Sequence, residues 1–149
     1  HMAVHPDVVA RNSGRPVIVV PAGYRTESLG DVAVIAWDGR RAAARAVADA
    51  MNVLENKSKV TVLSVSKPDQ TDLSSIDDLL ARHGINFTNE VQPKGAETIA
   101  SRILGTVEKS GAGLLIMGAY EHSKFAEDIF GGVTNEVLKK STVPVLLSH

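Results

Sequence analysis

Short apolar runs rich in β-branched residues alternate along the chain with longer segments in which apolar residues recur every three or four positions. Runs of the first kind predict strands, and spacing of the second kind predicts helices. The expected strands are 15–21, 32–37, 59–65, 85–91, 114–117 and 143–147, and the expected helices are 40–55, 73–83, 95–109 and 134–140. Because helices alternate with strands, the sequence predicts an α/β domain of three layers, α/β/α, around a mostly parallel sheet.

The expected strands are continuously apolar rather than alternating, which is typical of strands that are buried on both faces of a parallel sheet. In such folds, ligands bind beyond the carboxyl ends of the strands, where the strand order reverses. The residues that follow each strand are therefore the candidates for chemistry: Asp38, Val65 with Ser66, and Gly118 onward.

The amino-acid composition argues against several classes of binding partner and of chemistry. The chain has 149 residues, a size that fits one ordinary domain, and its net charge of −1 argues against a nucleic-acid or anionic-membrane partner, which needs a basic surface. It contains no cysteine, so disulfide and thiolate chemistry are excluded. Apolar runs stay far short of the roughly 20 residues that span a bilayer, and we expect a cytoplasmic protein.

Asp38 and Gly39 follow the second expected strand, and two interpretations of Asp38 remain open. Its carboxylate is placed to meet a ribose or a base edge at the end of a buried strand. Alternatively, Asp-Gly is a common turn dipeptide, and Asp38 is then the cap of the helix that begins near Arg40.

A second group of residues consists of Gly118, Gly131, Gly132 and Thr134. Glycines at a strand end and at a helix start let backbone N–H groups approach a phosphate, with help from the helix dipole. The alternative is a tight turn and an ordinary helix start that is capped by Thr134 and supported by Glu136. The pattern is neither a dinucleotide fingerprint nor a P-loop.

No arrangement of residues predicts catalysis. The histidines lack metal-ligand spacing, and neither a nucleophile elbow nor an ordered Ser, His and Asp set is present. We therefore expect no catalytic residue, no metal site formed by the protein, and at most weak ATP hydrolysis.

Taken together, these motifs resemble the universal stress protein family. The resemblance rests on Trp37-Asp38-Gly39, the strand 60–65, Met117-Gly118, the segment 131–138 and the closing Val143-Pro144-Val145-Leu146. It implies a Rossmann-like fold with a five-stranded, mostly parallel sheet, here with an extra N-terminal strand. It also implies a regulatory domain of the stress response that binds ATP or AMP, with Mg²⁺ where the nucleotide carries it.

The resemblance also assigns roles to residues. It places Asp38 at the adenine or ribose, and Val65 and Met117 beside the same groups. The residues that would hold the ribose and phosphates are Gly118, Gly131, Gly132, Val133 and Thr134.

Two positions depart from the family pattern: Glu121 stands where a second glycine is expected, and Gly132 stands where serine or threonine is expected. Glutamate carries a Cβ and a negative charge toward the phosphates, and two unit charges about 5 Å apart repel by roughly 3 kcal/mol at an effective dielectric near 20. We therefore expect a weakened or empty site. The alternative functions are a nucleotide-independent dimerisation or signalling domain with an unknown signalling partner and, third, an ATP-hydrolysing enzyme.

The expected organisation has four parts. Residues 1–2 are interpreted as a cloning remnant, 3–22 as the closing segment of a preceding universal stress-like domain, 23–30 as a linker and 31–149 as the domain itself. In this family the final strand pairs antiparallel with its counterpart in a partner. Here Val17, Ile18 and Val19 are expected to pair with the terminal strand of the same chain or of a second copy, at Val145, Leu146 and Leu147.

Overall fold

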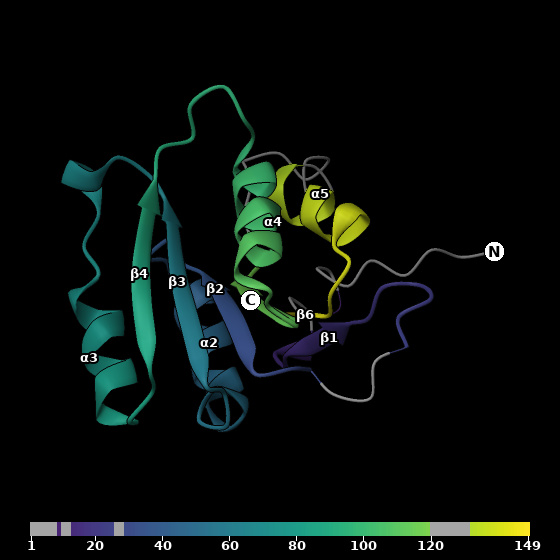
Figure 1. The fold of residues 1–149 in the computed structure, drawn as a ribbon, viewed down its shortest axis with the longest axis horizontal. Coiled ribbons are helices and arrows are strands. Elements are labelled where there is room, and N and C mark those ends of the chain that lie inside the picture. Colours follow the sequence, from purple (N-terminus) through teal and green to yellow (C-terminus); the bar gives the residue numbers. More distant parts are fainter. Residues whose placement is uncertain (1–8, 10–12, 26–28, 120–131) are drawn as a thin grey trace.

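The chain folds into a six-stranded sheet with helices on both faces (Figure 1). The structure is a computed structural model that describes residue 9 and residues 13–25, 29–119 and 132–149. The strands are β1 (Val17–Val19), β2 (Val32–Ala36), β3 (Lys59–Val65), β4 (Phe87–Gln92), β5 (Leu114–Gly118) and β6 (Val145–Ser148). The described helices are α2 (Arg41–Leu54), α3 (Ser74–Arg82), α4 (Ile99–Ser110), α5 (Gly132–Lys140) and the short 3-10 helix η1 (Pro68–Gln70).

The strand order is β1-β6-β5-β2-β3-β4. Neighbouring strands from β6 to β4 run parallel, and only β1 runs antiparallel, against β6. The chain proceeds outward from β2 through β3 to β4 and then returns to the other side of β2 with β5. The strand order therefore reverses between β2 and β5, which is where such a fold binds ligands. The predicted fold class is confirmed, including the extra N-terminal strand.

Two apolar clusters cover the two faces of the sheet. One contains the buried residues of α2 and α3 with strand residues such as Ile35 and Ile116. The other contains those of α4 and α5 with the alternate strand residues, such as Val34 and Met117. Since successive strand residues point to opposite faces, the continuous apolar runs supply both clusters at once.

The first strand forms one edge of the sheet, a position that tolerates the proline before it because no neighbouring strand needs its missing N–H. Val17, Ile18 and Val19 pair antiparallel with Leu147, Leu146 and Val145 of the same chain. Arg45 of α2 also donates to the carbonyl of Gly14 with Nη2···O of 2.9 Å and so fastens the segment that enters β1. The sequence left open whether this strand pairs within its own chain or with a second copy. In the structure it pairs within its own chain.

Two helix starts differ from the sequence prediction. Helix α4 begins at Ile99 and not near Gly95, because Gly95 is in a turn with φ of +61° and Thr98 is the N-cap. Helix α5 begins at Gly132, two residues before the predicted start, so that Thr134 lies in its first turn and is not a cap. Among the helices of the described segments, none is long and apolar enough to cross a membrane.

Candidate functional site

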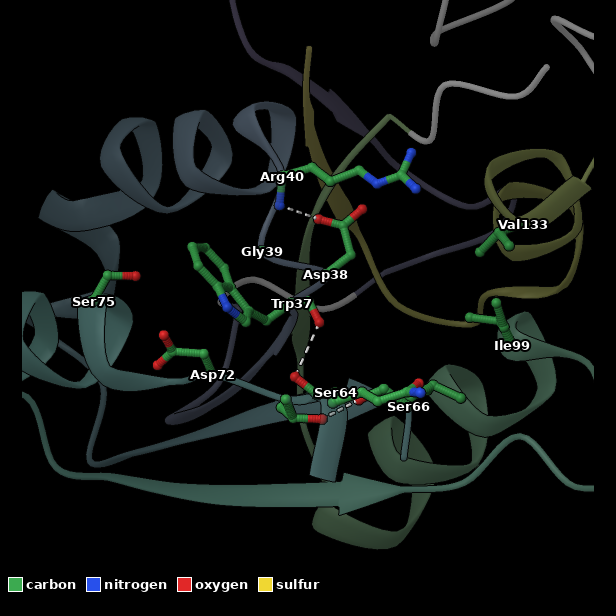
Figure 2. Close-up of a pocket in the computed structure, with 13 residues that line it drawn as sticks. Trp37, Asp38, Gly39, Arg40, Ser64, Ser66, Asp72, Ser75, Ile99 and Val133 are labelled. Atoms are coloured by element: carbon green, nitrogen blue, oxygen red, sulfur yellow. Dashed lines mark hydrogen bonds between the residues drawn. The ribbon is translucent and has the colours of Figure 1, made fainter. Parts of the chain in front are cut away.

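A cleft of about 640 Å³ opens at the carboxyl edge of the sheet (Figure 2). Its floor is formed by the residues that follow β2 and by the end of β3. One wall is the connection from η1 to α3, and the other is formed by the first residues of α4 and α5. The lining residues are Trp37, Asp38, Gly39, Arg40, Ser64, Val65, Ser66, Gln70, Thr71, Asp72, Ser75, Ile99 and Val133.

Asp38 closes the turn before α2 and also lines the cleft, although the N-cap of α2 is Arg40. Its Oδ1 accepts a hydrogen bond from the backbone N–H of Arg40 at 2.9 Å, which closes the turn before α2. Gly39 sits in this turn with φ of +76°, a conformation that side chains rarely adopt. The exposed Asp38 nevertheless lines the cleft, and this leaves its second carboxylate oxygen for a ligand.

Trp37 is the most unusual group in the lining. The residue is only 8% exposed, and its indole N–H is the one buried side-chain polar atom without a hydrogen-bond partner among the described residues. Its backbone is well held, because its N–H donates to Leu63 at 2.8 Å and its carbonyl accepts from the hydroxyl of Ser64 at 3.1 Å. Leaving a buried donor unpaired costs about 1–3 kcal/mol, so this N–H marks a place where an acceptor is missing.

Side chains with hydroxyl groups line the cleft between Trp37 and α3. Ser66 and Thr71 share a short hydrogen bond between their hydroxyls, and Thr71 donates to the carbonyl of Lys67 at 2.8 Å. These bonds attach the η1 connection to the end of β3. Ser66 and Thr71 therefore form a hydroxyl wall of fixed geometry on this side of the cleft.

Asp72 occupies the amino end of α3. Its Oδ1 accepts from the backbone N–H of Ser74 at 3.0 Å and from the Ser74 hydroxyl at 2.7 Å, and these two bonds hold the pKa of Asp72 below its usual value. Because the pKa is lowered in the folded state, the stabilisation is present above the unfolded pKa and is lost as the pH falls through the folded one. Helix α3 therefore already has an anion at its amino end at neutral pH.

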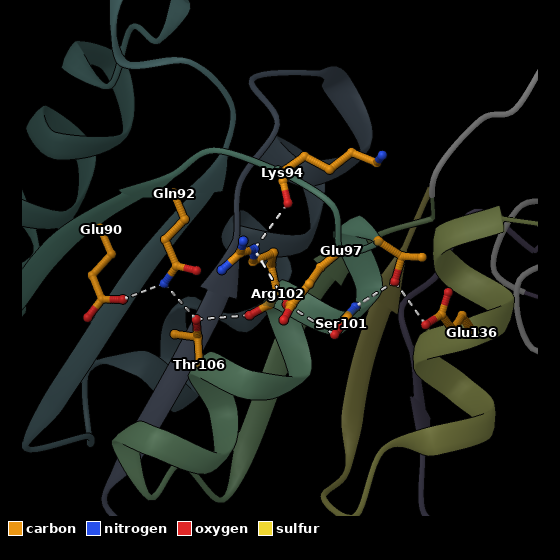
Figure 3. A network of polar contacts seen from close by, with 9 residues as sticks. Glu90, Gln92, Lys94, Glu97, Ser101, Arg102, Thr106 and Glu136 are labelled. Atoms are coloured by element: carbon orange, nitrogen blue, oxygen red, sulfur yellow. Dashed lines mark hydrogen bonds and ion pairs between the residues drawn. The ribbon is translucent and has the colours of Figure 1, made fainter.

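The opposite wall depends on a contact between two helices. Thr98 accepts from the N–H of Ser101 at 3.0 Å and donates to Glu136 of α5 at 3.0 Å. Glu136, the fifth residue of α5, also pairs with Lys140 at 3.4 Å, so its described contacts are with Thr98 and Lys140. Figure 3 shows this contact at the end of a polar network that continues through Arg102 and Thr106 to Gln92. The contact between Thr98 and Glu136 joins the two helix starts from which Ile99 and Val133 line the cleft.

The structure brings three of the proposed nucleotide-binding residues into the cleft, namely Asp38, Val65 and Val133. Three others are buried away from its lining: Met117 is 0% exposed, Thr134 is 2% exposed, and Gly118 packs under α2. Gly132 is exposed and begins α5 with φ of +79°. Gly131 and Glu121 lie outside the described residues.

Sequence reasoning missed most of the hydroxyl wall and two larger side chains. Trp37 and Arg40 lie close to the predicted Asp38, and Ser66 is one of the predicted strand-end positions. Thr71, Asp72 and Ser75 follow β3 by several residues, and no sequence signal indicated that the η1 connection folds back over the strand ends.

A smaller cavity of about 170 Å³ adjoins the cleft, and Asp38 and Arg40 line both. It lies at the amino end of α2 and is completed by Arg41, Ala42, Ala119 and His149. Among the described residues, no three His, Asp or Glu side chains form a cluster that is suited to a metal ion.

An open, mostly parallel α/β sheet with a cleft at its carboxyl edge is the architecture of nucleotide-binding α/β proteins. Comparison with known proteins shows which family of α/β proteins the chain is similar to. A model of the universal stress protein family matches residues 79–149. A curated universal stress protein of Synechocystis is 24% identical over 152 residues, which cover 98% of this chain and 51% of that protein.

Solved structures agree with this match. A universal stress protein from Archaeoglobus fulgidus superposes with a TM-score of 0.73 at 25% identity, over 89% of this chain and 49% of that one. A universal stress protein in complex with cAMP superposes with a TM-score of 0.64 at 21% identity, over 80% and 96% of the two chains, and shows the shared fold. The resemblance to the universal stress protein family is confirmed. The chain spans about half the length of the Synechocystis and Archaeoglobus relatives.

Proposed function

We propose that the chain is a regulatory domain of the stress-response type that binds an adenine nucleotide, AMP or ATP, in the cleft at the carboxyl edge of its sheet. The observation that carries the proposal is the unpaired indole N–H of Trp37 in the lining of a cleft of about 640 Å³, beside the carboxylate of Asp38. Clefts of this volume are typical of small-molecule sites. One structural relative was solved in complex with cAMP, which supports a nucleotide as the ligand.

The chemistry of the lining fits a nucleoside. Trp37, Val65 and Ile99 offer apolar surface to a purine, and the hydroxyls of the η1 wall offer hydrogen bonds to its polar edge. The free carboxylate oxygen of Asp38 accepts from a ribose hydroxyl. In this arrangement the indole N–H of Trp37 gains the acceptor that it lacks.

We expect weak binding. Asp38 and Asp72 place two carboxylates in the lining, and each repels a phosphate that approaches it. Solvent at the open face screens this repulsion without removing it.

Calorimetric titration with AMP, cAMP, ADP and ATP, with and without Mg²⁺, tests the proposal. We expect measurable heat at or below millimolar AMP, and we expect Asp38→Ala to weaken binding at least fivefold, since a hydrogen bond to a charged group is worth about 1.5–3 kcal/mol. The matched control is Asp31→Ala, because the exposed Asp31 precedes β2 at the opposite edge of the sheet. Absence of heat with every nucleotide would contradict the proposal and favour a nucleotide-independent signalling domain.

We also propose that bound ATP is not turned over at a significant rate. The described lining contains no histidine or lysine that would act on a γ-phosphate. Mg²⁺ then enters only as a companion of ATP. Steady ATP hydrolysis that is abolished by Asp38→Ala would contradict this and indicate an enzyme.

A further inference from the structure

We propose that Arg40 is the residue of the cleft that holds the anionic group of the ligand, so that a nucleotide with one phosphate binds better than a polyphosphate. The proposal rests on the proposed function, since it concerns the same cleft. It names a binding residue that neither the glycine pattern nor the family resemblance had singled out.

The position of the Arg40 side chain supports this role. Arg40 lines both the cleft of about 640 Å³ and the adjoining cavity of about 170 Å³, so it lies where the two meet. Asp38 binds the backbone N–H of Arg40 and does not pair with its guanidinium. Figure 2 shows the guanidinium extending beyond the Asp38 carboxylate, on the side of the view where Val133 and α5 lie.

Among the described residues, no competing partner pairs with the Arg40 guanidinium. Ion pairs in the described parts of the chain join His83 to Glu55, Arg102 to Glu97, and Lys140 to Glu136, and none of them includes Arg40. Its donors are therefore available to a carboxylate or phosphate, which guanidinium groups bind with two parallel hydrogen bonds.

The local electrostatics at the amino end of α2 also favour an anion beside Arg40. Arg40 is the N-cap of this 14-residue helix, makes no side-chain capping bond, and is followed by Arg41. The first turn contains no acidic residue. Cations at the amino end of a helix oppose its dipole, and a local choice that conflicts with the fold is typical of a functional site. The Asp38 carboxylate, bonded to the backbone N–H of Arg40, offsets part of this conflict, and a bound anion would offset more of it.

Charge is distributed unevenly along the cleft. Asp72, already bonded to Ser74, makes the α3 end of the cleft negative. Arg40 is the only cation in the described lining, against the two carboxylates of Asp38 and Asp72. A ligand therefore places its charged group at the Arg40 end and its neutral, hydrogen-bonding group toward Trp37 and the hydroxyl wall. One phosphate is matched by one guanidinium, whereas further phosphates meet uncompensated carboxylates.

The test compares adenosine with AMP, because they differ only in the phosphate. The chain has a single tryptophan, Trp37, so its fluorescence reports occupation of the cleft directly. We expect Arg40→Gln to weaken AMP binding about tenfold or more, as for the loss of a charged hydrogen-bond pair, and to leave adenosine binding within about twofold. ATP is expected to bind the unmodified protein more weakly than AMP. Thermal unfolding should show Arg40→Gln to be at least as stable as the unmodified protein.

The matched control is Arg41→Gln, which removes a neighbouring charge from the same helix end but lines only the smaller cavity. It should leave AMP affinity within about twofold. Undiminished AMP binding by Arg40→Gln, or an equal loss of adenosine and AMP binding, would overturn the assignment of Arg40 while leaving the proposed function standing. Failure of the unmodified protein to bind either ligand would instead contradict the proposed function, and the assignment with it.

Discussion

Gly118 shows how one residue acquires a different role when its surroundings are known. A glycine at a strand end is typical of a backbone that approaches a phosphate, and the sequence predicts this role for Gly118. In the structure, a Cβ at this position would lie 2.4 Å from the carbonyl carbon of Ala42 and 2.5 Å from the N of Ala43. The glycine is therefore required so that β5 can pass close under the first turn of α2.

We predict that Gly118→Ala lowers the free energy of unfolding by about 1–3 kcal/mol, the usual range for overpacking against immobile atoms. Gly105 is the matched control. It lies within α4 with open space where a Cβ would be, so Gly105→Ala should raise stability by about 0.5–1 kcal/mol. Urea denaturation of the two variants measures both changes. Equal stability of Gly118→Ala and the unmodified protein would refute the packing role.

Met117 and Thr134 show what sequence reasoning could not resolve at this scale. The strand-end rule predicts Asp38 and Val65, which line the cleft, because the rule depends only on where parallel strands end. The rule does not say which face of a strand a side chain occupies, and both faces here are apolar. Met117 belongs to the cluster beneath α4 and α5, and the early start of α5 places Thr134 inside the first turn, 2% exposed.

At the scale of elements, the amino ends of α4 and α5 form one unit. Thr98 caps α4 through Ser101 and also donates to Glu136 of α5, so one hydroxyl determines both where α4 begins and how it meets its neighbour. Ile99 and Val133, which follow these helix starts, form a wall of the cleft.

We predict that Thr98→Val lowers the free energy of unfolding by about 1–2 kcal/mol, because the isosteric change removes a capping acceptor. It should also weaken AMP binding, since the wall formed by Ile99 and Val133 is no longer fixed. The control is Thr88→Val on the exposed side of β4, which should change stability by less than about 0.5 kcal/mol. Chemical denaturation and AMP titration provide the measurements. If Thr98→Val matched Thr88→Val in both stability and AMP affinity, the Thr98 cap would not be what holds the wall formed by Ile99 and Val133.

Sequence patterns predicted the elements better than their ends. Every expected strand and helix is present, because apolar spacing determines what can be buried. Helix starts depended on contacts between distant segments, such as Thr98 with Glu136, 38 residues apart. The η1 connection carried no periodic signal, and its attachment to β3 through Ser66 and Thr71 appears only in the folded chain.

For the whole molecule, the main feature is the strand that covers β6. Strand β1 pairs with β6 along Val145–Leu147, and these residues are almost fully buried. The outer strand carries Ile18, which is 50% exposed, and is followed by Val20, which is 56% exposed. An uncovered apolar edge invites association with another strand. The first strand therefore protects the terminal strand of the sheet.

We predict that deletion of residues 1–22 causes association or loss of solubility, since it uncovers the edge of β6. Deletion of residues 1–12 is the matched control, because it keeps β1 and the contact of Arg45 with Gly14. Light scattering of both proteins at equal concentration measures the mass. An unchanged mass and solubility after removal of 1–22 would show that β1 does not protect the edge.

The central claim is that the cleft at the carboxyl edge of the sheet binds an adenine nucleotide. A difference-density map of the protein crystallised with millimolar AMP tests it most directly. We predict density between Asp38 and Val133, with the base within hydrogen-bond reach of the Trp37 indole N–H and the phosphate beside Arg40. An empty cleft at that concentration, or AMP bound at another surface, would contradict the account.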